Sequence, residues 1–119
     1  MPGLSGPSGF ADRFARAGQA RGHGVALSAS ATRVELSIGW QSVDSAFRLA
    51  NVRIVRAGKV VARAPSALAK LRITTLRRTA LRTTVRIEGV TQGELRFEVR
   101  AATVDRAQRV TIRVVQQRV

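Results

Sequence analysis

From about Thr32 onward, apolar and polar residues alternate along the chain with a period of two. Val34, Leu36 and Ile38 alternate with polar residues, and similar short runs follow as far as Val114. Successive side chains of a strand point to opposite faces, so this pattern predicts amphipathic strands with one apolar face and one arginine-rich face. Turn residues divide the region into about seven short strands. Since no helix is expected to cover them, the apolar face must meet another sheet, a second copy of the chain or an apolar ligand.

The expected fold is mainly β, an antiparallel amphipathic sheet that forms an open groove, a sandwich or a part-barrel. The alternation changes parity at Ala50-Asn51, which predicts a β-bulge or a bend in the strand. Ala57-Gly58 predicts a tight turn, and Pro65 predicts the end of a strand. Residues 75–82 are compatible with either an extended strand or a single helical turn.

The first 31 residues differ in composition, because they hold most of the glycines, two of the three prolines and several serines. We therefore expect two parts, a flexible basic leader over residues 1–31 and a β domain over residues 32–119. An alternative for part of the leader is a short amphipathic helix over Ser8 to Arg21, where Phe10, Phe14 and Ala17 are spaced i, i+4, i+7.

Lysine and arginine total 21 residues against 7 aspartates and glutamates, which gives a formal net charge of +14. Such a balance favours contact with a polyanion, either nucleic acid or an anionic membrane surface. A purely structural role for the arginines is to keep strand edges from pairing with other chains. The residues predicted to contact an anionic surface are Arg13, Arg16, Arg72, Arg86 and Arg96.

Few residues are suited to catalysis or metal binding. The chain has no cysteine and one histidine, His23, for which the sequence offers no catalytic partner. We therefore predict a protein that is not an enzyme and that has no cofactor and no metal site. Glu94 and Glu98 share one face of an expected strand and are predicted to pair with cross-strand arginines. Trp40 is the one candidate for stacking on a nucleic-acid base, or else it caps the edge of the core.

Several segments between Val34 and Val99 resemble one repeat of the AsmA-like superfamily, the bacterial bridge-like lipid-transfer proteins that include the TamB and YhdP groups. Val34-Glu35-Leu36-Ser37-Ile38-Gly39-Trp40 is similar to the opening strand of such a repeat, and Phe47 to Ile54 to its second strand. The segments that resemble the later turn and strands are Gly58 to Ser66, Leu71-Arg72-Ile73, Leu76 to Leu81 and Thr84 to Val90.

The resemblance implies strands that line a groove and contact phospholipid acyl chains in envelope lipid transport or biogenesis. It also implies a periplasmic or inner-membrane-associated location, whereas the chain as written, without a signal peptide or membrane helix, is expected in the cytoplasm. The alternative is that the same apolar residues form a dry core. The predicted lipid-facing lining consists of Phe47, Leu49, Val52, Ile54, Leu71, Ile73, Val85, Ile87, Leu95, Phe97 and Val99.

Three functions are therefore open at the level of sequence. The first is a lipid-contacting module, whose partners would be phospholipid or an anionic membrane surface. The second is a basic nucleic-acid-binding protein, for example one associated with the ribosome. The third is a truncated gene product without independent function, for which self-association or further repeats of a longer protein would complete the sheet.

Overall fold

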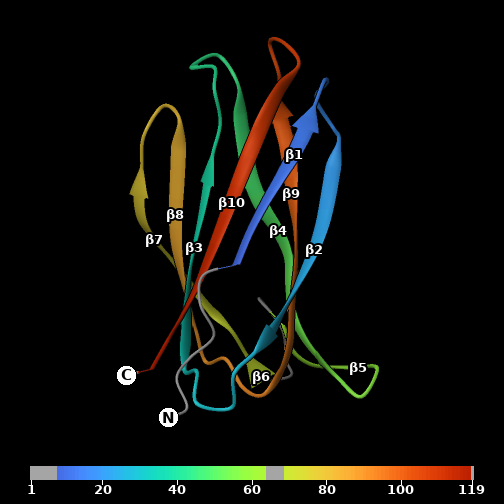
Figure 1. Cartoon of the computed structure of the whole chain (residues 1–119), viewed down its shortest axis with the longest axis vertical. Coiled ribbons are helices and arrows are strands. Elements are labelled where there is room, and N and C mark those ends of the chain that lie inside the picture. Colours follow the sequence, from blue (N-terminus) through green and yellow to red (C-terminus); the bar gives the residue numbers. More distant parts are fainter. Residues whose placement is uncertain (1–7, 64–68, 119) are drawn as a thin grey trace.

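The computed structural model describes residues 8–63 and 69–118, which form two five-stranded sheets packed face to face (Figure 1). Sheet A has the strand order β1-β10-β3-β8-β7, and sheet B has the order β2-β9-β4-β5-β6. Neighbouring strands are antiparallel except for the short β5–β6 pair. The strands are β1 (Ser8–Phe14), β2 (Ala20–Leu27), β3 (Arg33–Gly39), β4 (Ala46–Arg56), β5 (Lys59–Arg63), β6 (Ala69–Lys70), β7 (Arg72–Arg78), β8 (Arg82–Glu88), β9 (Gly93–Thr103) and β10 (Gln108–Gln117). The prediction of a mainly β, antiparallel fold is confirmed.

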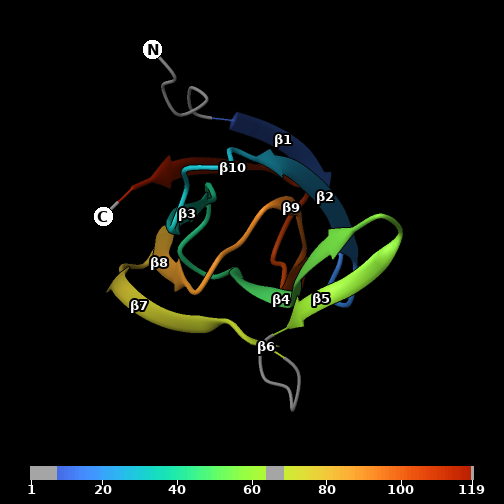
Figure 2. The same ribbon diagram turned by 90° about the horizontal axis from the view of Figure 1, so that it is seen from below.

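The order of the strands is that of a jelly roll. The chain passes between the sheets so that β1, β10, β3 and β8 lie side by side in one sheet, and β2, β9, β4 and β5 in the other. The short β6 and the longer β7 are additions between β5 and β8, and they carry the chain from sheet B back to sheet A (Figure 2). Because most neighbouring strands are far apart in sequence, the fold depends on long-range pairing.

The core fills the space between the two sheets. On β3, Val34, Leu36 and Ile38 are at most 1% exposed, and the alternate residues face outward. Leu95, Phe97 and Val99 of β9 face them from sheet B and are equally buried. The period-two pattern therefore forms a sandwich with a closed apolar core, and not an open groove.

Two local predictions in the β4 region are confirmed. The pairing of β4 with β9 shifts register between Ala50 and Arg53, and Asn51 in the shift has a φ of 52°. The Asn51 side chain donates a hydrogen bond to Oε2 of Glu98 at 2.8 Å. At the β4–β5 turn, Ala57 and Gly58 both have positive φ, 52° and 78°, as a two-residue hairpin turn requires.

Residues 75–82 form the end of β7 and the turn into β8, so the helical turn considered for them is not observed. Pro65, predicted to end a strand, lies outside the described residues. Among the described residues there is no helix, and hence none that is long and apolar enough to cross a membrane.

The prediction of a leader over residues 1–31 is wrong for residues 8–27, which form β1 and β2, one edge strand of each sheet. A spacing of four residues fits a helical face, but it also keeps parity in a strand, so Phe10 and Phe14 both turn toward the core. Phe14 is completely buried and packs against Phe47 of β4. The predicted boundary at residue 31 is therefore not a structural boundary, and the short helix over Ser8 to Arg21 is not observed.

Two loops at one end of the sandwich are joined by hydrogen bonds to Asp105. Ser42 Oγ donates to its Oδ2 at 2.7 Å, and Ser45 Oγ donates to its Oδ1 at 2.5 Å. These bonds, led by the one from Ser45, hold the pKa of Asp105 below its ordinary value of 3.8. Gln108, which is buried, continues the network by donating to Ser45 Oγ and accepting from the backbone of Ser42. The network fixes the β3–β4 loop to the β9–β10 loop.

Candidate anion-binding face

The outer face of sheet A carries two adjoining depressions that share Gly39, Arg82 and Thr111. These three residues lie directly opposite one another on β3, β8 and β10. The volumes of the depressions are about 420 and 530 Å³. We call this surface the arginine trough, and its members are Arg77, Arg82, Arg109 and Arg113 around Gly39, with the hydroxyl groups of Ser37, Thr79, Thr84 and Thr111.

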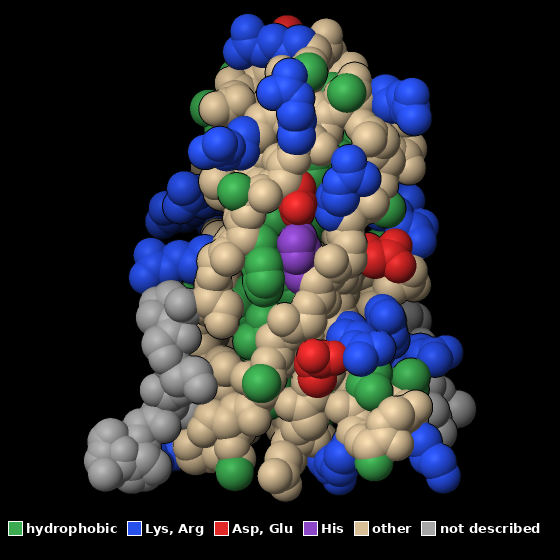
Figure 3. All heavy atoms as spheres, turned by 45° about the vertical axis from the view of Figure 1, so that its right-hand side comes forward, with side chains coloured by type: hydrophobic (Ala, Val, Ile, Leu, Met, Phe, Trp, Pro, Cys, Tyr) green, Lys and Arg blue, Asp and Glu red, His purple; other side chains and the backbone are tan. Residues whose placement is uncertain are grey.

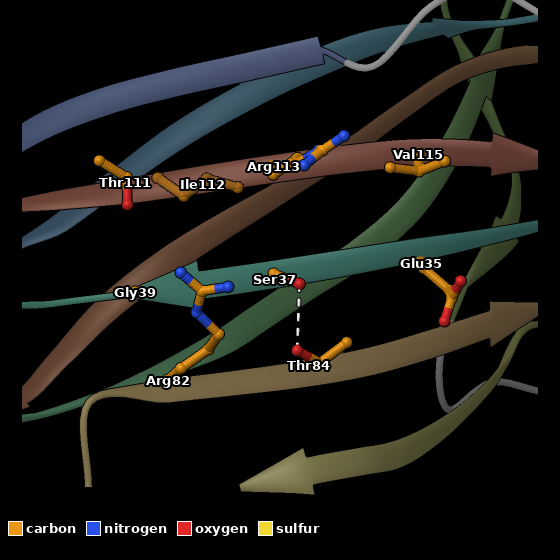
Figure 4. A pocket seen from close by; sticks show the side chains of 9 residues that line it. All are labelled: Glu35, Ser37, Gly39, Arg82, Thr84, Thr111, Ile112, Arg113 and Val115. Carbon is orange, nitrogen blue, oxygen red and sulfur yellow. Dashed lines mark hydrogen bonds between the residues drawn. The ribbon is translucent and has the colours of Figure 1, made fainter. Parts of the chain in front are cut away.

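The absence of a side chain at Gly39 shapes the centre of the arginine trough. The Arg82 side chain extends from β8 toward β3, so that its guanidinium lies over Gly39 (Figure 4). A Cβ atom at Gly39 would lie 3.7 Å from Nε of Arg82 and 3.3 Å from Oγ1 of Thr111. Glycine within a strand often marks a place where another group approaches the backbone closely. Here the approaching group is the guanidinium.

Hydroxyl groups form the adjacent row of the arginine trough. Ser37 lies opposite Arg113 on one side and Thr84 on the other, and the two hydroxyl oxygens of Ser37 and Thr84 are 3.0 Å apart (Figure 4). Thr84 is in turn paired with Arg77 of β7. The row therefore places two hydroxyl groups between two cationic groups, a combination suited to phosphate or carboxylate oxygens.

Sheet B pairs two of its outward arginines with carboxylates, whereas its exposed Arg48 and Arg63 make no ion pair with a described residue. On sheet B, Arg96 pairs with Glu94, and Nη2 of Arg100 lies 3.1 Å from Oε1 of Glu98. Hydrogen bonds from Asn51 and Arg100 hold the pKa of Glu98 below its ordinary value of 4.5. The prediction that Glu94 and Glu98 pair with cross-strand arginines is wrong, because each takes the arginine two residues further along its own strand, on the same face.

By contrast, the guanidinium groups of Arg77, Arg82, Arg109 and Arg113 make no ion pair and no hydrogen bond with another described residue. Glu35, at the margin of the arginine trough, instead accepts a hydrogen bond from Gln117. Arg13 of β1 lies opposite Arg109 and adds a further cation beside the arginine trough. Sheet A therefore presents several uncompensated guanidinium groups on one surface.

The arginines predicted to contact an anionic surface are divided over the molecule. Arg13, Arg72 and Arg86 lie on the strands of sheet A, whereas Arg16 lies between β1 and β2 and Arg96 is paired on sheet B. Arg86 is half-buried, and its Nε has no hydrogen-bond partner among the described residues. The four trough arginines could not be singled out from sequence, because alternation alone does not reveal which strands become neighbours.

The predicted lipid-facing residues are found almost entirely in the sandwich interior. Two of the eleven are less buried, namely Leu49, which packs partly buried against the core, and Ile73, which is 39% exposed. In this closed arrangement the lining is covered by the opposite sheet, so its contact with lipid stays a prediction that would require the sheets to separate. The residues buried in the core are Phe47, Val52, Ile54, Leu71, Val85, Ile87, Leu95, Phe97 and Val99.

Of the two roles predicted for Trp40, stacking on a base or capping the edge of the core, the structure is consistent with the second. Its ring packs at 5.5 Å from the ring of Phe47, and its Nε1 is buried without a hydrogen-bond partner among the described residues. The indole therefore caps the edge of the core. No other aromatic residue lines the arginine trough.

His23 has a partner that the sequence did not predict. Its Nε2 lies 2.5 Å from Oδ2 of Asp12, across the narrow opening between the edge strands β1 and β2 (Figure 3). Phe10 stacks on the imidazole at 4.2 Å, and Phe97 lies behind it at 5.8 Å. Among the described residues no hydroxyl group bonds to His23, and no cluster of three metal-binding side chains occurs. The pair thus joins the two sheets.

No protein-family model matches this chain, and no curated protein matches it in sequence. The resemblance to the AsmA-like superfamily accordingly stays a prediction from the residue pattern.

Proposed function

We propose that this protein is a non-enzymatic binding module that holds nucleic acid against the outer face of sheet A. The observation that supports the proposal is the gathering of four arginines without carboxylate partners in one trough, whereas Arg96 and Arg100 of sheet B are paired. Arginine and hydroxyl side chains are the usual partners of phosphate oxygens in nucleic-acid complexes. The net charge of +14 adds a general attraction to a polyanion.

The binding mode would involve the phosphate backbone and not the bases. Proteins that bind single strands through a sheet stack bases on exposed aromatic residues, and the arginine trough has none apart from the half-buried Trp40. Affinity should therefore depend little on nucleotide sequence. If all four trough arginines contact phosphates, the slope of log K against log salt for duplex DNA should be about −4.

An anionic membrane surface is the main alternative partner. A protein that lies on a membrane needs apolar side chains that enter the acyl boundary. The arginine trough contains one exposed large hydrophobic residue, Leu81, at its end. The other large hydrophobic residues that are exposed among the described residues lie outside it, namely Val43, Ile73 and Leu76. The polar character of the surface favours nucleic acid.

The experiment is a fluorescence-anisotropy titration with labelled RNA, single-stranded DNA and duplex DNA of mixed sequence, repeated over a range of salt concentrations. We expect saturable, sequence-independent binding with the slope given above. Vesicles of phosphatidylglycerol and phosphatidylcholine form the parallel arm. Binding to these vesicles with no binding to any nucleic acid at low salt would reject the proposal and assign the face to a membrane.

A further inference from the structure

Strand β7 is an open edge of sheet A. It pairs with β8 on one side, and no other described strand pairs with it. All seven of its residues are exposed, although they lie in a regular strand. Exposed sheet edges present unpaired backbone N–H and C=O groups, which can accept a further strand.

The β7–β8 hairpin also carries most of the large hydrophobic side chains that are exposed among the described residues. Four large hydrophobic side chains are exposed among the described residues, and three of them, Ile73, Leu76 and Leu81, belong to this hairpin or its turn. Each of these three is 39% exposed. Apolar side chains grouped on an otherwise charged surface mark an interaction site more often than isolated ones do.

The charge of the edge restricts what can pair with it. The sequence of β7 contains Arg72, Arg77 and Arg78 and no acidic residue. A second copy pairing through β7 would place arginines near arginines, and like charges on paired strands are destabilising. The same arginines attract a strand with acidic side chains. The edge is thus protected against self-pairing and is complementary to an acidic segment.

We propose that β7 is a docking edge for an extended acidic peptide that alternates acidic and apolar residues and adds to sheet A as a further strand. The acidic residues would face Arg72 and the outer face of the sheet, and the apolar ones would cover Ile73 on its inner side. The register shift between Thr75 and Arg77 makes Arg72–Thr75 the regular part of the edge, so the main pairing is expected there. Main-chain hydrogen bonds would supply affinity, and the side chains would supply selectivity.

The test uses the full chain and a blocked seven-residue peptide that alternates glutamate with valine. We expect saturable binding, together with slower hydrogen exchange of the β7 amides in the complex as measured by NMR. The variant Arg72→Glu should weaken binding by about fivefold, because Arg72 lies on the outer face in the regular part of the edge and an attractive cross-strand pair becomes repulsive. The matched control Arg48→Glu changes the net charge equally at an exposed residue of sheet B and should bind like the original protein.

Three results would overturn this proposal. The first is peptide binding without slowed exchange in β7, which would indicate attraction by the general positive charge. The second is equal weakening of peptide binding by the control variant Arg48→Glu. The third is a concentration-dependent dimer in sedimentation that protects the β7 amides without peptide, since this would assign the edge to a second copy. None of these results depends on whether the arginine trough binds nucleic acid.

Discussion

The guanidinium of Arg82 lies over Gly39, the residue directly opposite it on the neighbouring strand β3. The position of this cation therefore depends on a residue that has no side chain. This relationship links the sequence of a strand interior to the surface that we propose binds nucleic acid.

Substitution of Gly39 should weaken nucleic-acid binding without removing any charge. In Gly39→Ala, the added Cβ would lie 3.3 Å from Oγ1 of Thr111, so that Thr111 must shift slightly, and it would come into van der Waals contact with the Arg82 guanidinium. We expect a small loss of affinity for Gly39→Ala and a larger loss for Gly39→Glu, which adds a carboxylate among the guanidinium groups. Anisotropy titrations at constant salt measure both. An unchanged affinity in Gly39→Glu, with an unchanged melting temperature, would exclude the arginine trough as the binding surface.

The Asp12–His23 pair should stabilise the edge where β1 and β2 meet. Both side chains are mostly buried, at 14% exposure for His23 and 16% for Asp12, and the imidazole donates a charge-assisted hydrogen bond to the carboxylate. We expect Asp12→Asn to lower the free energy of unfolding by about 1 to 2 kcal/mol. His23→Gln removes the other partner, and the variant with both substitutions completes a double-mutant cycle that gives the coupling energy of the pair. A coupling energy near zero in urea denaturation would show that the contact contributes nothing.

Asp105 should make part of the stability depend on acidity. Its pKa in the folded protein lies below 3.8 because Ser45 and Ser42 donate hydrogen bonds to the ionised carboxylate. A group with a lowered folded pKa contributes stability that is fully present above its unfolded pKa and is lost as the pH falls through the folded pKa. Asp105→Asn should therefore be less stable than the original protein at neutral pH, and the difference should shrink below about pH 4. Denaturation curves from pH 7 to pH 2 measure it, and a constant difference would contradict the assignment.

The core residues should behave as structural residues and not as a lipid lining. Phe97 is 1% exposed, and its replacement by alanine should cost about 3 to 5 kcal/mol of unfolding free energy. If Phe97→Ala does not fold, Ile54→Val tests the same point and should lower the free energy of unfolding by about 1 kcal/mol. We expect extraction of the purified protein to yield no stoichiometric phospholipid. Co-purified phospholipid that is lost in Ile54→Val would instead support acyl chains between the sheets.

Alternation predicted the inward and outward faces of β3, β4 and β9, because the period of two is a local property of the sequence. The same pattern did not reveal that β1 pairs with β10, since pairing between the two ends of the chain leaves no local trace. The high glycine content near the N-terminus led to the wrong prediction of a flexible leader. At Gly24, a Cβ atom would lie 2.9 Å from Cδ of Glu94, so this glycine provides space beside β9 and does not indicate a flexible leader.

The candidate site was harder to predict than the fold. Arg77 and Arg82 lie in the segment 75–82, whose conformation was ambiguous from sequence. The trough arginines come from β7, β8 and β10, whose adjacency to β3 or to one another follows from topology alone. The net charge indicated a polyanion, but it did not indicate which face would bind. In the folded protein, Glu94 and Glu98 pair with arginines on sheet B and not with those of the arginine trough.

The most direct test of the proposed function compares charge reversals on the two sheets. Arg82→Glu/Arg113→Glu alters the arginine trough, and Arg48→Glu/Arg63→Glu makes the same change in net charge on sheet B. Affinity for duplex DNA and its salt dependence are measured for both. We expect the trough variant to lose at least about tenfold in affinity and about 2 in salt slope, while the sheet B variant changes little. Equal losses in both variants would show that the total charge, and not the outer face of sheet A, determines binding.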